Sequence, residues 1–237
     1  MEKLSRLGGF LFAIAMAGFG IQNLFHAFVA GPAPGPPWTL GRSFWAYFTV
    51  VVLIAAAVSI LTGKKARWAA MLLAVMLLLR MLFVYAPRLD ANPHDPGPWT
   101  SGFEILAMSG AALVLAGTMV GLARFLFAIP LVVFGTQHFL YARFVATLVP
   151  SWICWHLFWA YFVGVAFVAA AVSIAARKYA GLAGTLLGLM FLLWVFSVHL
   201  PRVAASPHDG KEWTSALVAL AMCGGAWVVA GRVANSG

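Results

Sequence analysis

The chain has 237 residues, of which 63% are hydrophobic and only 9% are charged, and its formal net charge is +9. This composition excludes an ordinary water-soluble protein, because apolar runs of about twenty residues, the length that spans a bilayer, recur along the whole chain. The positive charge does not indicate nucleic-acid binding, since no run of basic residues is longer than two.

Eight apolar runs predict eight membrane-spanning helices. They lie at residues 8–29, 43–62, 67–86, 100–119, 121–146, 155–176, 179–200 and 213–232. These stretches, rich in Leu, Ala, Val, Met and Phe, lack the polar alternation of a barrel strand, so an all-α integral membrane protein is expected. The first run resembles a signal peptide, but it aligns with the run at 121–146 and we interpret it as a retained helix.

The sequence repeats itself at an offset of 114 residues. Phe-Trp-Ala-Tyr-Phe at 44–48 returns at 158–162, and Pro-His-Asp at 93–95 returns at 207–209. When the second half of the chain is laid over the first without a gap, about half of the positions are identical, far more than shared apolar composition supplies.

This duplication predicts two four-helix membrane repeats, at residues 1–119 and 120–237. Four spans are an even number, so both repeats enter the membrane from the same side and run parallel. The inverted repeats of many transporters are therefore not expected.

Lysine and arginine predict the orientation of the helices. The N-terminus and the even-numbered connections carry Lys3, Arg6, Lys64, Lys65, Arg67, Arg124, Arg177 and Lys178. Because basic loops stay in the cytoplasm, both termini are expected there.

All six histidines fall on the opposite, outer side in this topology, which indicates an outward-facing site. Gln137 and His138 lie towards the outer end of the fifth span, His199 lies at the end of the seventh, and His26 is their counterpart in the first copy. Three interpretations stay open: interhelical hydrogen bonding, contact with a quinone head group, and axial ligation of haem b by His138 and His199.

Arg80 and Glu104 are the charges that lie well inside predicted helices. Both are expected about 6–10 Å below the outer interface, on sequential helices, and we expect them to pair. The second copy has Trp194 and Val218 at these positions, so both charges are absent together. The pair is either structural or part of a functional cavity, with Glu104 carrying protons or facing a cation and Arg80 holding an anion or a quinone oxygen.

The outer loops contain most of the remaining motifs. Pro87 and Pro201 are expected to end the third helix of each copy, and Thr100 and Thr214, with the serines that follow, are expected to supply capping hydroxyls for the fourth. The His-Asp pairs of these loops provide only two ligands per copy, so no metal site is predicted.

Four segments of the second copy form a recognisable set: Gln137-His138-Phe139, Val-Pro-Ser-Trp at 149–152, Trp-Ala-Tyr-Phe-Val-Gly at 159–164 and Val-His-Leu-Pro at 198–201. Together they resemble the DoxX-like family of small four-helix membrane proteins. The resemblance covers residues 125–232 best, and the first copy carries it in degraded form. The resemblance implies a tandem helical bundle in the bacterial inner membrane and a relation to subunits of quinone-linked oxidation systems. It does not identify a catalytic residue in this chain.

The expected function is that of an integral subunit of a redox or electron-transfer assembly that touches quinone near the outer face. Its expected partners are the lipid bilayer and other membrane subunits. One alternative is a non-enzymatic anchoring or accessory subunit whose tryptophan-rich flank packs on a partner or on lipid, and another is transport of a small solute. Whether the chain is itself an enzyme stays open.

Overall fold

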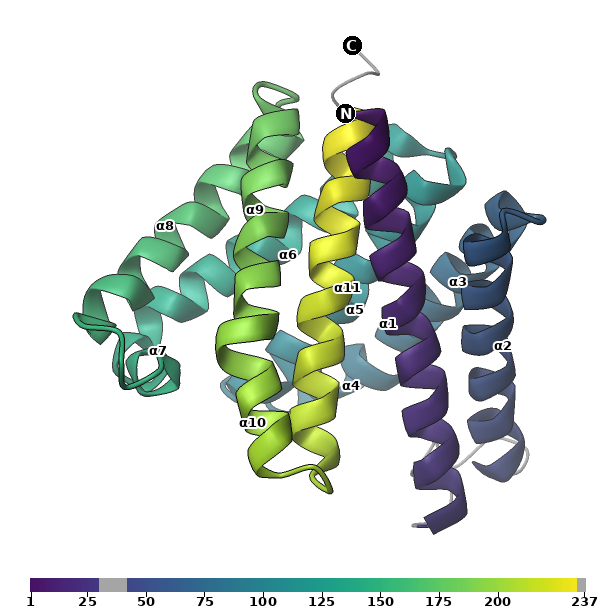
Figure 1. Ribbon diagram of the computed structural model, residues 1–237, viewed down its shortest axis with the longest axis horizontal. Coiled ribbons are helices and arrows are strands. Elements are labelled where there is room, and N and C mark those ends of the chain that lie inside the picture. Colours follow the sequence, from purple (N-terminus) through teal and green to yellow (C-terminus); the bar gives the residue numbers. More distant parts are fainter. Residues whose placement is uncertain (30–41, 234–237) are drawn as a thin grey trace.

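The computed structural model describes the backbone of residues 1–29 and 42–233 and the side chains of residues 1–25 and 44–233. These residues are helical and contain no strand (Figure 1). The elements are α1 (Glu2–Val29), α2 (Arg42–Thr62), α3 (Ala66–Arg80), η1 (Met81–Tyr85), α4 (Ala86–Ala91), α5 (Pro96–Ala116), α6 (Val120–Leu140), α7 (Ala142–Leu148), α8 (His156–Ala175), α9 (Ala180–Trp194), η2 (Val195–His199), α10 (Leu200–Ala205) and α11 (Gly210–Val233).

Eight helices of the described chain are long and apolar enough to cross a membrane. Helices form because backbone amides in lipid need partners within their own segment. The predictions of an all-α fold and of eight spans are therefore confirmed, and the protein is a multi-pass membrane protein.

The third and seventh spans each consist of three helical segments, at Ala66–Ala91 and Ala180–Ala205. The prediction that proline ends these helices is wrong. Proline lacks an N–H group and crowds the carbonyl four residues earlier, and the helix adapts by widening into a π-helical turn just before Pro87 and Pro201. In the first of these turns the N–H of Ala86 donates to the carbonyl of Met81, five residues back.

The helices pack in a crosswise pattern, in which the first helix of each half contacts the last long helix of the other half. Helix α1 packs against α2 and also against α11, while α6 packs against α8 and also against α5. Helix α3 packs on α5, α9 packs on α11, and α5 and α11 contact each other in the middle of the bundle. In Figure 1, α1 and α11 lie side by side at the centre, with α2 and α3 on one flank and α8 and α9 on the other.

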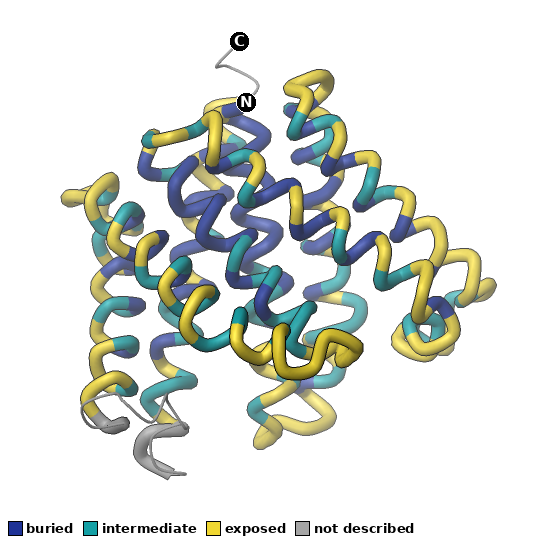
Figure 2. The backbone as a smooth tube through the Cα atoms, turned by 180° about the vertical axis from the view of Figure 1, so that it is seen from behind, coloured by how far each residue is buried: buried dark blue, intermediate teal, exposed yellow. Residues whose placement is uncertain are grey.

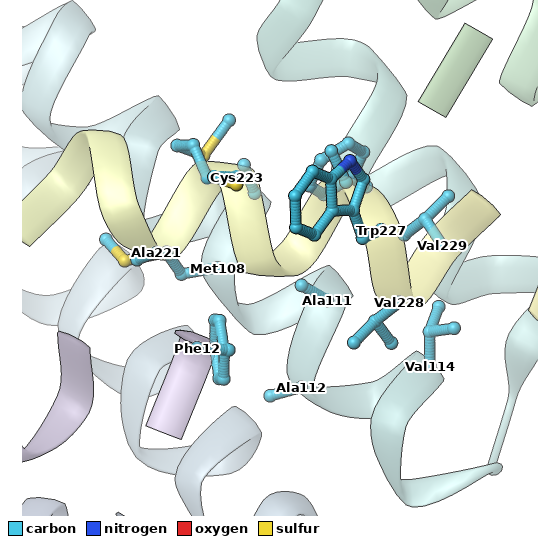
Figure 3. Packing of buried hydrophobic residues seen from close by; sticks show 14 of the residues in the cluster. Phe12, Met108, Ala111, Ala112, Val114, Ala221, Cys223, Trp227, Val228 and Val229 are labelled. Carbon is cyan, nitrogen blue, oxygen red and sulfur yellow. The ribbon is translucent and has the colours of Figure 1, made fainter. Parts of the chain in front are cut away.

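The core lies where α1, α5 and α11 meet. Figure 3 shows Phe12 of α1 close to Ala112 of α5, with Trp227 and Val228 of α11 in the same cluster. Buried positions occupy the middle of the bundle and exposed positions cover its outer surfaces (Figure 2). Small residues permit the closest approach: a Cβ atom on Gly8 would lie 2.6 Å from the carbonyl oxygen of Gly224.

Candidate functional site

A polar cavity of about 200 Å³ lies inside the first half of the bundle. Its wall is built by α1, α2, α3, η1, α5 and α11. The polar side chains that line it include Arg80, Glu104, Tyr85, Gln22, Asn23 and Ser101. In a chain that is 63% hydrophobic, this concentration of polar groups inside membrane-spanning helices needs a reason beyond packing.

Arg80 and Glu104 line the same cavity, but they do not form the ion pair expected from the sequence. Among the described residues no salt bridge within 4.0 Å joins them, and Nε of Arg80 is buried without a hydrogen-bond partner. Both side chains are half-buried. Arg80 lies on α3 and Glu104 lies on α5, and both line the same cavity. A buried polar atom without a partner, such as Nε of Arg80, destabilises a protein by about 1–3 kcal/mol unless another molecule bonds to it.

Tyr85 reaches this cavity because of the π-helical turn in which it lies. The turn η1 adds one residue to the helical repeat, which changes the direction in which the side chains after Arg80 point. Pro87 accounts for the turn, so a proline in the sequence helps to place the side chain of Tyr85 in the cavity wall.

The corresponding region of the second copy is filled by aromatic rings. Phe167 lies with its ring centroid 5.8 Å from that of Phe191 and 6.0 Å from that of Trp194. Phe134 lies 5.8 Å from Phe167 on the other side. These rings close-pack the space that remains open in the first copy.

Some of the differences between the copies lie in the cavity wall. Phe167 and Phe191 stand where the first copy has Leu53 and Leu77, and Trp194 stands where it has Arg80. All three first-copy residues line the cavity. The first copy has smaller or charged side chains at the positions where the second copy has large rings.

The histidines predicted as site residues lie apart from this cavity. The Nδ1 atom of His138 is 2.8 Å from the carbonyl oxygen of Phe134, and its ring meets Phe167 edge-on at 5.2 Å. His199 lies in η2, and its Nδ1 atom is buried without a partner among the described residues. No hydrogen bond or ring contact between these two described side chains is present. His26 lies in α1, and its side chain is outside the described residues.

Gln22 and Gln137 connect the two halves of the chain. Nε2 of Gln22 donates to the carbonyl oxygen of Gly210 at 2.6 Å and to Oγ1 of Thr214 at 2.7 Å. Oε1 of Gln137 accepts from Oγ1 of Thr100 at 3.0 Å, and its Nε2 donates to the carbonyl oxygen of Pro96 at 3.2 Å. Each glutamine therefore ties its helix to the first turn of a helix from the other half.

Replacing Gln137 by methionine is expected to lower the free energy of unfolding by about 1–2 kcal/mol, because Thr100 and Pro96 lose a shared partner. The apparent Tm in detergent should fall by about 3–6 °C. The control is Thr136→Val, because the hydroxyl of Thr136 bonds only to the carbonyl oxygen of Val132 in its own helix. Equal Tm values for the two variants would contradict the connecting role of Gln137.

The Pro-His-Asp loops start the fourth helix of each copy. Oδ1 of Asp95 accepts from the N–H of Gly97 at 2.9 Å and caps α5, and Oδ1 of Asp209 accepts from the N–H of Lys211 at 2.8 Å. The prediction that Thr100 supplies the cap is wrong: its hydroxyl donates to the carbonyl of Pro96, because Pro96 already forms the first position of the helix. In the described part of the chain no three His, Cys, Asp or Glu side chains cluster closely enough for a metal ion.

The sequence predictions named Arg80 and Glu104 but missed other cavity residues, among them Asn23, Thr49 and Ser101. The duplication contained a signal for Asn23, because the second copy has the ring of His138 at the equivalent position. It contained none for Thr49 and Ser101, whose equivalents are Val163 and Ser215.

A protein-family model described as a domain of unknown function, DUF8561, matches residues 127–228. The match covers less than half of the chain and extends from α6 into α11. No curated protein and no solved structure matches the chain.

Proposed function

We propose that this protein is a membrane subunit of a redox assembly and that it binds a quinone head group in the cavity between α1, α3 and α5. The observation that carries the proposal is the pair of unjoined charges, Arg80 and Glu104, on the wall of one cavity of about 200 Å³. A quinone ring is a compact group with two carbonyl oxygens, and its tail is as apolar as the helix surfaces around the cavity.

The polar lining suits this chemistry. Quinone oxygens accept hydrogen bonds, which the guanidinium group of Arg80 and the hydroxyl group of Tyr85 can donate. Reduction to quinol takes up two electrons and two protons. A redox centre of a partner subunit supplies the electrons, and the Glu104 carboxyl group passes protons at the site. The predicted contributions of Gln137, His138, His199 and His26 to cofactor contact stay predictions.

The resemblance to DoxX-like proteins supports the same proposal. We further propose that the two sequence copies form parallel four-helix repeats, with boundaries at residues 119 and 120. The packing supports this arrangement, because each contact of α1, α2, α3 and α5 has a counterpart among α6, α8, α9 and α11.

We also place the protein in the bacterial inner membrane with both termini in the cytoplasm. The two termini lie at the same end of the bundle (Figure 1), and this end carries the basic connections such as Lys64 and Lys178. Excess lysine and arginine at one end is typical of the cytoplasmic side.

A second candidate is a non-enzymatic accessory subunit that docks on a partner. It is supported by the segment between α7 and α8, where Trp152 and Trp155 are 74% and 77% exposed, next to the exposed Phe144 of α7. Tryptophan is enriched both at membrane interfaces and at protein interfaces, so this surface suits lipid or a partner chain.

The two candidates are separated by mild purification with native lipid, followed by quinone extraction and an oxidised-minus-reduced absorption spectrum. Quinone retained by the isolated chain in about equimolar amount supports the head-group site. A chain free of quinone, whose cofactors all reside in copurifying subunits, contradicts the site and supports the accessory role.

A further inference from the structure

A second cavity, of about 610 Å³, lies at the end of the bundle that holds both termini. It is formed by the first turns of α1, the C-terminal end of α2, the N-terminal end of α3, and the C-terminal ends of α5 and α11. The two cavities share no lining residue, and their nearest lining residues on α1, Phe10 and Met16, lie about six residues or roughly 9 Å apart along the helix. The two cavities are therefore separate sites.

Three arginines from three helices converge on this cavity: Arg6 of α1, Arg67 of α3 and Arg232 of α11. None of the described residues that line it is acidic. Arg67 and Arg232 have no hydrogen-bond or ion-pair partner among the described side chains. Arg6 contacts Glu2 at 2.6 Å, but both side chains are more than three-quarters exposed, so water screens this pair and another anion can compete for the arginine.

The carbonyl oxygens of Leu113 and Val114, near the end of α5, do not bond to these guanidinium groups. The carbonyl oxygens of Leu113 and Val114 accept bonds from the N–H groups of Thr118 and Gly117 at 3.2 and 3.0 Å. Gly117 adopts a left-handed conformation, with φ of 66°, that makes this closure possible. The arginines therefore face the cavity with their donors available.

The three arginines are not repeated at the equivalent positions of the duplicated sequence. The positions equivalent to Arg6, Arg67 and Arg232 are Gly121, Gly181 and Thr118. None of these three equivalent positions is charged; Gly121 and Gly181 lie in the second half of the chain and Thr118 lies in the first. The counterpart of this cavity carries one arginine, Arg124, at the position equivalent to Gly9, whereas the cavity itself carries three.

We propose that this cavity is a binding site for a phosphate-bearing anion, held by Arg6, Arg67 and Arg232. A planar guanidinium group presents two parallel N–H donors that match two phosphate oxygens, and three such groups around one cavity match a tetrahedral dianion or a phosphodiester. The phosphate comes either from the headgroup of an anionic lipid or from a soluble phosphate compound. This proposal does not rest on quinone binding.

The test uses the full-length chain in nanodiscs of zwitterionic lipid. One arm measures retention of added phosphatidylglycerol by native mass spectrometry, and the other measures binding of inorganic phosphate by ³¹P NMR. The variant Arg67→Gln with Arg232→Gln is expected to weaken binding by about tenfold or more, because two charge-assisted contacts are lost. Single variants at each position, with circular dichroism spectra, separate loss of binding from loss of folding.

The matched control is Lys64→Gln with Lys178→Gln, which removes two positive charges at the same end without touching the cavity. Retention of phosphatidylglycerol that depends on the arginines alone supports the proposal and assigns the phosphate to lipid. Binding of inorganic phosphate with the same dependence supports it and assigns a soluble ligand. Equal loss in both double variants, or no binding of either probe to the unmodified chain, overturns it.

Discussion

Replacing Gly224 by leucine is expected to be among the most destabilising single changes in this protein. A Cβ atom at this position would lie 2.5 Å from the backbone nitrogen of Phe12 and 2.6 Å from the carbonyl oxygen of Gly8. Both are backbone atoms of α1, so they cannot move aside as a flexible side chain does, and α1 and α11 must separate along an extensive contact. We expect a loss of about 3 kcal/mol, which corresponds to a fall in apparent Tm of about 10 °C.

The measurement is thermal unfolding of purified protein in detergent, followed by circular dichroism. Gly121→Leu is the matched control, because no atom lies within 4 Å of a Cβ atom built on Gly121. It makes the same change of side chain at an open helical position, and its Tm should stay close to that of the unmodified chain. Equal Tm values for the two leucine variants would refute the close contact between α1 and α11.

Converting the polar cavity into the form found in the second copy is expected to abolish quinone retention while leaving the protein folded. The double variant Arg80→Trp with Glu104→Val introduces the residues that the chain already uses at Trp194 and Val218. It removes both charges at once and places an indole ring in the cavity, so neither charge is left alone in the membrane. The quinone extracted per mole of purified protein should fall by about tenfold or more, because the hydrogen-bond donor and the space are lost together.

The control for this variant is Trp68→Leu with Phe83→Ser, which also introduces second-copy residues, at two exposed positions outside the cavity. It should retain as much quinone as the unmodified chain, and both variants should elute as the same species in size-exclusion chromatography. A folded Arg80→Trp, Glu104→Val protein with unchanged quinone content would exclude this cavity as the head-group site.

The sequence predicted the membrane spans well because apolar length and composition determine them. The boundaries differ where proline is involved. The fourth span begins at Pro96 instead of residue 100, and the third continues through Pro87 to Ala91. Both differences arise because proline is well tolerated in a first helical turn, and because a π-helical turn can absorb its missing hydrogen bond.

The candidate site was predicted only in part. Arg80 and Glu104 were identifiable as charges inside apolar helices, and they do line one cavity. Among the described residues they do not form the ion pair expected from their similar depth on sequential helices, and spacing along the chain does not reveal this. The presence of Gln22 and Thr214 in the same wall depends on α1 packing against α11, a contact between the first and last helices that no local pattern in the sequence indicates.

The crosswise packing has a consequence for the order in which the protein can mature. Helix α1 is synthesised before the other described helices, yet its main partner besides α2 is α11, which is synthesised after all of them. Before α11 is present, the face of α1 around Gly8 lacks the helix against which it packs, and Gln22 cannot bond to Thr214. The bundle therefore closes only after α11 has been synthesised, and a chain cut short before α11 should be recognised by membrane proteases as incomplete.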